Sequence, residues 1–182
     1  MKIRRLYLCA ALLGLVQLLC VADDDLLYVN ENYCFSAPRL QFSEEELSQD
    51  GTGVTFSMEK GCAEAPVWSC DKMSLYAEYA IADEQSRKDW FEDLNSAYIK
   101  EDWHVDARSV VLIDHINWHV STFSKMIGGR RIEAVAYQTY ASKSSPPVIY
   151  GVHAVFAGGS RSKMRLDINK AVRGFKYESA CK

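Results

Sequence analysis

Residues 131–156 read RIEAVAYQTYASKSSPPVIYGVHAVF, and this stretch decides the class of fold. Two runs rich in Val, Ile and Tyr, Arg131 to Tyr140 and Val148 to Phe156, flank the turn-forming Ser144-Ser145-Pro146-Pro147. Because β-branched and aromatic runs separated by such residues are typical of strands joined by a turn, they predict an antiparallel hairpin with a loop of six or seven residues.

Further elements extend this hairpin in both directions along the chain. Apolar periodicity at three- and four-residue steps predicts helices over 83–100 and 160–172, the second with Ser160 as N-cap. Few crossovers separate the strands, so we expect an α+β fold, an antiparallel β-sheet with two main helices packed on one face. Shorter strands are expected at Val54 to Met58, Ser74 to Ala80, Ser109 to Asp114 and Trp118 to Phe123.

The N-terminus predicts export. Basic residues at Lys2, Arg4 and Arg5 precede an uncharged run over 6–21, which is typical of a cleavable signal peptide over 1–22 with cleavage after Ala22. The run is short for a membrane anchor, and Leu19 before Cys20 fits lipidation poorly. Residues 23–182 are therefore expected to form a single secreted or periplasmic domain.

Four cysteines follow the predicted signal peptide, and an even number in an exported chain predicts two disulfides. Cys62 and Cys70 bracket a short turn-like insert, so a local bridge is the simplest pairing, which leaves Cys34 with Cys181; other connectivities stay open. The cysteines lack the close spacing of a zinc site, and we expect neither a metal nor a cofactor.

Charge narrows the choice of partner. Without Lys2, Arg4 and Arg5, the 21 basic residues fall to 18 against 24 acidic residues, a net charge of −6. An acidic domain argues against nucleic acid or an anionic membrane as the partner.

Two short motifs resemble a known superfamily. The segment YCFSAP at 33–38 looks like the opening strand of the photosystem-II extrinsic PsbP-like and bacterial DcrB-like proteins, and DINKAVRGFK at 167–176 looks like their closing helix and strand. The resemblance implies an antiparallel sheet flanked by helices. It also implies an accessory or binding role, because known members are mostly non-catalytic.

Catalytic motifs are weak in this chain. No serine lies in a G-x-S-x-G elbow, and the cysteines are expected to be oxidised, which disfavours a cysteine nucleophile. Gly128-Gly129 precedes a strand, so it predicts a hairpin turn and not a phosphate loop. A hydrolase using His115, His119 or His153 remains an alternative.

Aromatic and basic residues provide the binding candidates. Trp68 lies in the cysteine-bracketed loop, and the strand parity that groups Tyr137 with Glu133 predicts an outward-facing tyrosine face. Exposed aromatic residues on a rigid scaffold are typical interaction anchors, although a second apolar layer would explain them equally well. The candidate binding residues are Trp68, Trp103, Trp118, Tyr137, Arg130 and Arg131.

The sequence therefore predicts an exported, non-enzymatic domain that binds another protein. One specific version is an immunity-type inhibitor of a periplasmic toxin. The alternatives are a small-ligand-binding or envelope-accessory protein with a pocket between sheet and helices, and the hydrolase.

Overall fold

A computed structural model describes residues 27–38, 44–62, 65–66, 69–79, 91–92, 95–141, 147–157 and 161–177. The predicted signal peptide and its cleavage site lie outside these residues, as do Trp68 and Cys181. In the described ranges, no helix is long and apolar enough to cross a membrane.

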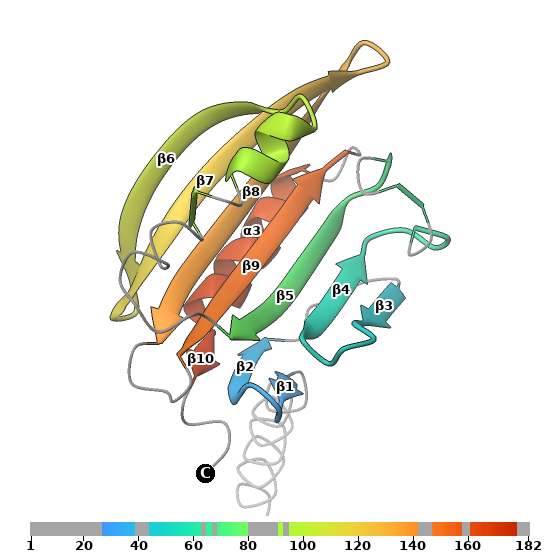
Figure 1. Cartoon of the computed structure of the whole chain (residues 1–182). Helices are drawn as coiled ribbons and strands as arrows, with labels where there is room; N and C mark the ends of the chain where they lie inside the picture. Colours follow the sequence, from blue (N-terminus) through green and yellow to red (C-terminus); the bar gives the residue numbers. More distant parts are fainter. Residues whose placement is uncertain are drawn as a thin grey trace, which may run out of the picture.

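A seven-stranded antiparallel sheet forms the centre of the molecule (Figure 1), in the strand order β3-β4-β5-β9-β8-β7-β6. The predicted hairpin is confirmed as β8 and β9, which pair from Glu133 with Phe156 to Ala141 with Val148. The strands are β3 (Glu44–Leu47), β4 (Gly53–Ser57), β5 (Lys72–Tyr79), β6 (His104–Ile113), β7 (Ile116–Ile127), β8 (Arg130–Ala141) and β9 (Val148–Phe156).

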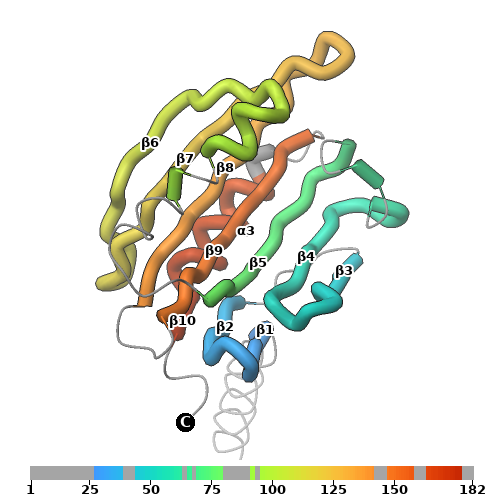
Figure 2. The backbone as a smooth tube through the Cα atoms, viewed as in Figure 1, coloured from blue at the N-terminus to red at the C-terminus, as the bar shows by residue number. Residues whose placement is uncertain are grey.

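A second, three-stranded sheet joins the two ends of the described chain. In it β2 (Phe35–Pro38) pairs with both β1 (Leu27–Asn30) and β10 (Lys176–Tyr177), as the tube in Figure 2 shows. The ring of Phe35 stacks on Phe175 with centroids 5.3 Å apart. The two motifs at 33–38 and 167–176 therefore meet in space.

The predicted C-terminal helix is present as α3 (Arg161–Arg173). Its apolar stripe is buried against the seven-stranded sheet, as the periodicity predicts. The fully buried Trp118 belongs to the same core, which we call the α3 core. The stripe consists of Met164, Ile168, Ala171 and Val172.

The two helices lie on opposite faces of the sheet, so the expectation that both would pack on one face is wrong. On β9, Val152 and Ala154 belong to the α3 core, whereas Val155 belongs to a second cluster with Trp103. Helical residues 95–100 cover this second cluster, where Tyr98 stacks on Phe123 at 4.0 Å. In Figure 1 this helical segment lies in front of the sheet and α3 behind it. An apolar stripe indicates that a helix packs on a sheet, but not on which face.

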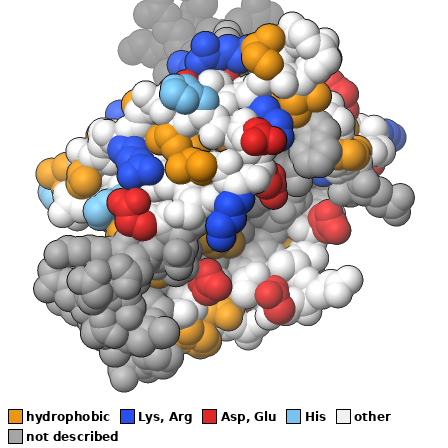
Figure 3. Space-filling model, turned by 45° about the horizontal axis from the view of Figure 1, so that its top comes forward, with side chains coloured by type: hydrophobic (Ala, Val, Ile, Leu, Met, Phe, Trp, Pro, Cys, Tyr) orange, Lys and Arg blue, Asp and Glu red, His pale blue; other side chains and the backbone are white. Residues whose placement is uncertain are grey.

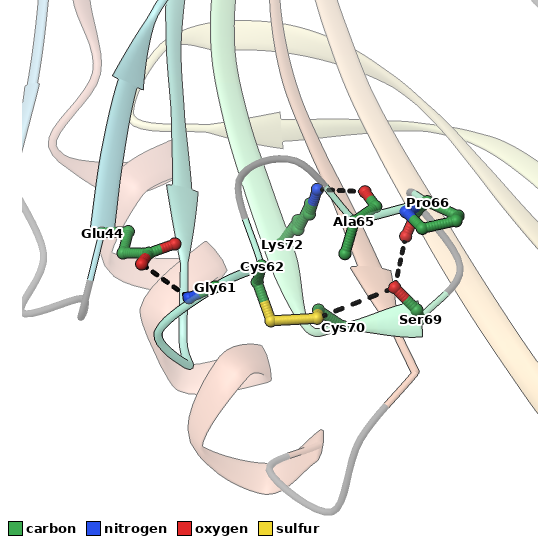
Figure 4. The surroundings of a disulfide bond; sticks show 8 residues. All are labelled: Glu44, Gly61, Cys62, Ala65, Pro66, Ser69, Cys70 and Lys72. Atoms are coloured by element: carbon green, nitrogen blue, oxygen red, sulfur yellow. Dashed lines mark hydrogen bonds between the residues drawn. A yellow bond between two sulfur atoms is a disulfide. The ribbon is translucent and has the colours of Figure 1, made fainter.

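The disulfide prediction is confirmed in part. A bridge joins Cys62 to Cys70 across the insert that precedes β5 (Figure 4). Cys34 is also disulfide-bonded, but its predicted partner Cys181 lies outside the described residues. The described residues therefore show one of the two expected bridges, and the pairing of Cys34 with Cys181 stays a prediction.

Candidate functional site

A pocket of about 370 Å³ opens between α3 and the β7–β8 part of the sheet. It combines an apolar floor with charged side chains from β6, β8 and α3, and this combination makes it the candidate binding site. The lining residues that the argument uses are Asp106, Arg131, Glu133, Val135, Tyr137 and Arg165.

The β8 strand supplies one wall by simple alternation. Side chains two residues apart share a face of a strand, so Arg131, Glu133, Val135 and Tyr137 all point towards α3. Val135 is buried in the floor, while Arg131 at the strand end is 57% exposed. The floor is therefore apolar and the rim is charged.

A β-bulge directs Asp106 into this pocket. On β6, Val105 pairs with Phe123 and Ala107 pairs with Thr122, so Asp106 is an extra residue between two ladder positions. Such bulges turn a side chain away from its regular direction. The carboxylate of Asp106 accepts a hydrogen bond from Ser124 Oγ at 2.9 Å, and it lines the pocket with residues of β8.

Two arginines from different elements meet at the pocket rim. Glu133 lies between them, with Oε1 3.4 Å from Arg131 Nε and Oε2 3.5 Å from Arg165 Nη2. Arg131 Nη2 also lies 3.2 Å from Asp106 Oδ2. Arg165 is held further by its position over the Phe156 ring, 6.0 Å from the centroid. These contacts place both guanidinium groups beside the apolar floor.

Tyr137 adds a neutral hydrogen-bonding group to the pocket. Burial raises the pKa of its phenol, and the positive charge of Arg165 partly offsets this effect. The phenol therefore stays protonated and can both donate and accept a hydrogen bond. Its ring lies edge-on to Trp118 with centroids 6.3 Å apart, which anchors Tyr137 to the α3 core.

The structure brings together two of the six predicted binding residues, Arg131 and Tyr137. Arg130 points elsewhere, because its Nη2 donates a hydrogen bond of 2.6 Å to the carbonyl of Ala157. The prediction that the tyrosine face of β8 is outward-facing is wrong, since α3 packs over that face. The small residues on the opposite face of β8 do pack under a helix, as expected, but under residues 95–100.

Trp103 and Trp118 are not exposed anchors. Trp118 is fully buried in the α3 core and Trp103 is 6% exposed in the second cluster. The alternative considered from the sequence, an apolar layer, describes them correctly, because a large ring on a two-sided sheet is stabilised most by full burial. Trp68 lies outside the described residues.

The histidines proposed for a hydrolase are separated. His115 is exposed in the turn between β6 and β7, with φ of 69°. His119 stacks on Phe91 at 4.0 Å, whereas the His153 imidazole contacts the Tyr98 hydroxyl. Among the described residues, none of these three imidazoles has a carboxylate within ion-pairing distance, as a triad would need.

A second pocket, of about 500 Å³, lies on the opposite face beside the disulfide-bonded insert. His153 and Tyr98 form one side of it, and Lys72 forms another. The Lys72 ammonium donates a hydrogen bond of 2.9 Å to the carbonyl of Ala65, as Figure 4 shows. Burial lowers the pKa of His153 to about 4, so the imidazole is uncharged near neutral pH.

One group of possible metal ligands occurs in the described residues, Glu59 with Cys62 and Cys70. Both of its sulfur atoms are joined in the disulfide, so neither is a thiolate donor.

Sequence reasoning missed Arg165, Asp106 and the pairing role of Glu133. The sequence held a signal for Arg165, because this residue directly follows Met164 and so borders the predicted apolar stripe of α3. Asp106 gives no comparable signal. Its position in the pocket depends on a bulge, and the strand was expected to begin only at Ser109.

Comparisons with known proteins support the fold alone. No family model and no curated protein matches the chain. Among solved structures, cyanobacterial PsbP from Synechocystis has a TM-score of 0.58 at 7% identity, covering 83% of this chain and 91% of that one. LpqN, involved in cell envelope biogenesis of Mycobacterium tuberculosis, has a TM-score of 0.49 at 8% identity, with coverages of 78% and 82%. The match to cyanobacterial PsbP confirms the fold-level resemblance.

Proposed function

We propose that this protein is an exported, non-catalytic binding domain whose pocket between α3 and the sheet recognises a carboxylate joined to an apolar group. The observation that carries this proposal is the pair of guanidinium groups, Arg131 and Arg165, held by one carboxylate above an apolar floor. Pockets that fix one polar group and bury the rest of a ligand are the common form of small-ligand site.

The balance of donors and acceptors at the rim favours a ligand that accepts hydrogen bonds. Each guanidinium carries several fixed N–H donors and no acceptor, whereas a carboxylate offers two oxygens. One oxygen of Asp106 is already engaged by Ser124, and Glu133 is shared by both arginines. A ligand carboxylate supplies the acceptors that this arrangement lacks, in the bidentate geometry that arginine prefers.

The size of the pocket and its apolar floor indicate what kind of group the ligand carries beside its carboxylate. Val120, Val135, Phe156 and Ile168 supply apolar surface to a space of about 370 Å³. Burial of apolar surface contributes roughly 25 cal/mol per Å², so an aliphatic or aromatic group of modest size gains affinity here. Purely ionic ligands would leave this surface unused.

The carboxylate can belong to a free small molecule or to the chain end or side chain of a partner protein. A carboxylate from a partner protein would fit the protein-binding role expected from the sequence. Inhibition of a toxin is a narrower version of that role. On the face in Figure 3, basic and acidic side chains are interspersed with apolar ones, a composition suited to a protein contact.

A role without catalysis is supported by the histidines. The three candidate imidazoles lie in a turn, on an aromatic ring and beside a phenol. General acid–base chemistry needs a base oriented by a further group beside a nucleophile.

The test uses aliphatic monocarboxylates from butyrate to decanoate, with their primary amides as matched neutral controls, in calorimetric titrations of the purified protein. We expect the acids to bind and the amides to bind at least tenfold more weakly, since a charge-assisted hydrogen bond contributes about 1.5–3 kcal/mol. Peptides with free or amidated C-termini form the second arm. Preference for the free peptide over every fatty acid would identify a protein chain end as the source.

Arg165→Ala should weaken binding of the acid about tenfold or more. The matched control is Arg108→Ala, an exposed arginine that also pairs with a glutamate but lies on the other face of the sheet. The proposal fails if neither acids nor free peptides bind, or if both variants lose the same affinity.

A further inference from the structure

The seven-stranded sheet ends on one side in a long strand with apolar side chains in solvent. Among the strands that the structure describes, β6 is the last in the sheet order, and it spans ten residues. On it Val110 is 60% exposed and Leu112 is 67% exposed. An edge of this kind is a template for pairing with another strand.

The opposite edge of the sheet, β3, has features that discourage pairing with another strand. β3 has four residues, of which Glu44, Glu45 and Glu46 are acidic. Short length and charged side chains are the usual protections of an edge strand. The segment 108–113 of β6, by contrast, follows the bulge, pairs regularly with β7, and contains neither Lys nor Pro.

The turn between β6 and β7 fixes which backbone groups of β6 face outwards. Asp114 and His115 both have positive φ, 47° and 69°, which makes a two-residue turn of the primed type. The residues that flank such a turn, Ile113 and Ile116, exchange hydrogen bonds. Odd-numbered residues of 108–113 therefore bond β7, and the N–H and C=O groups of Arg108, Val110 and Leu112 point away from the sheet.

We propose that a second copy of this chain pairs antiparallel with this edge, about a two-fold axis at Val111, to form a continuous sheet through two molecules. In this register the backbone N–H and C=O groups of Val110 in one copy form hydrogen bonds with those of Leu112 in the other. By symmetry, Leu112 of the first copy pairs with Val110 of the second in the same way. On the α3 side of the sheet, Val111 meets Val111 of the second copy. Apolar cross-strand pairs of this kind stabilise a sheet by about 0.2–1 kcal/mol each.

Charge complementarity selects a copy of the same chain and this register. With Val110 opposite Leu112, Arg108 of each copy comes opposite the exposed Asp114 of the other. A shift that pairs Val110 with itself would place Arg108 opposite Leu112 instead. The contact of Arg108 with Glu92 is 3.3 Å long between exposed side chains, so it is weak enough to rearrange.

The first test measures the mass of the purified protein by sedimentation over a range of concentrations. We expect a reversible dimer, and we expect Leu112→Lys to weaken it at least tenfold because lysine protects an edge. Leu166→Lys is the matched control, since Leu166 is 63% exposed on α3 and should leave the dimer unchanged. A monomer at every concentration, or a dimer that tolerates Leu112→Lys, would overturn the proposal.

The second test reports the register. Val111 of the two copies would form a pair without backbone hydrogen bonds, with Cα atoms about 4.5 Å apart, within the range of a disulfide. Val111→Cys should therefore give a covalent dimer on oxidation. Ser109→Cys should not, because its copies would lie roughly 14 Å apart along the strands. Cross-linking through Ser109→Cys or Val110→Cys, and not through Val111→Cys, would exclude the proposed pairing.

Discussion

The pair formed by His153 and Tyr98 shows how burial sets the state of a polar contact. Burial lowers the pKa of His153 to about 4 and raises the pKa of Tyr98, so both side chains are uncharged near neutral pH. Their hydrogen bond satisfies two polar groups between the sheet and helical residues 95–100. The imidazole thus helps to stabilise the second cluster.

His153 should make stability depend on pH. Its pKa is lowered from 6.5 to about 4 on folding, so the unfolded chain binds a proton first as the pH falls. The contribution of neutral His153 to the free energy of unfolding should therefore be complete above pH 6.5. It should decrease as the pH falls towards 4, by up to about 3 kcal/mol. Urea denaturation of the native protein and of His153→Gln, at matched pH values, measures the difference.

His153→Gln keeps a hydrogen-bonding side chain but cannot gain the proton. Its stability should change less than that of the native protein between pH 6.5 and 4. Parallel curves for the two proteins in this window would mean that the folded state accommodates the charged imidazole.

At the residue scale, the structure places two of the proposed binding residues, Arg131 and Tyr137, in one pocket, whereas it buries Trp103 and Trp118. Strand parity correctly grouped the residues of β8 by face. It could not show which face had a gap beside its helix, because that depends on where α3 crosses the strands. Tryptophan occurs both in cores and at interfaces, so residue type alone did not show whether Trp103 and Trp118 are buried or exposed.

Among the elements, the insert closed by Cys62 and Cys70 is held by more than its disulfide. The carbonyl of Ala65 accepts the hydrogen bond from buried Lys72, and Ser69 Oγ donates a hydrogen bond of 2.7 Å to the carbonyl of Pro66 (Figure 4). The insert therefore shapes the wall of the second pocket.

Cys62→Ala with Cys70→Ala should reduce the free energy of unfolding by about 2–3 kcal/mol, the chain-entropy value for a short loop, less any strain. Urea denaturation measures the loss. Adding a reductant to this double variant then provides an internal control. A further loss reports the bridge of Cys34, and an unchanged midpoint for the double variant itself would show that the Cys62–Cys70 bridge contributes no stability.

The helices and strands that the sequence predicted well are those whose signals lie in neighbouring residues. The β8–β9 hairpin and the apolar stripe of α3 both depend on neighbouring residues, and both are confirmed. β6 begins at His104, earlier than expected, because its first part pairs with β7 across a bulge. Such an interruption depends on the partner strand and leaves no pattern in its own residues.

For the whole molecule, the contact between the two sheets is the feature that unites the chain. Phe35 of β2 is fully buried against Phe175 and Tyr150, and the Tyr150 hydroxyl donates a hydrogen bond of 2.9 Å to the carbonyl of Tyr33. The beginning and end of the described chain thus contribute to the same core as β9.

Phe35→Ala should cost about 3–5 kcal/mol, the usual loss for a buried phenylalanine. Because the two sheets share this core, near-UV and far-UV circular dichroism should report one coincident transition in native protein and variant alike. Exposed Tyr79→Ala is the control and should cost far less. Separate transitions would show that the small sheet unfolds independently.

Fold class was the most predictable property of the whole molecule. Antiparallel strands with two helices follow from the sequence and its resemblance. The assignment of helices to faces was wrong. It is a long-range property, set by how the chain returns across the sheet.

The bulge at Asp106 has a consequence for how this protein can change over generations. Strand pairing is regular on both sides of this one inserted residue. Loss of a single codon there would leave the hydrophobic side chains of β6 on a continuous ladder, yet it would remove the carboxylate that contacts Arg131. The smallest in-frame deletion could therefore change the charge at the pocket rim while leaving β6 paired with β7.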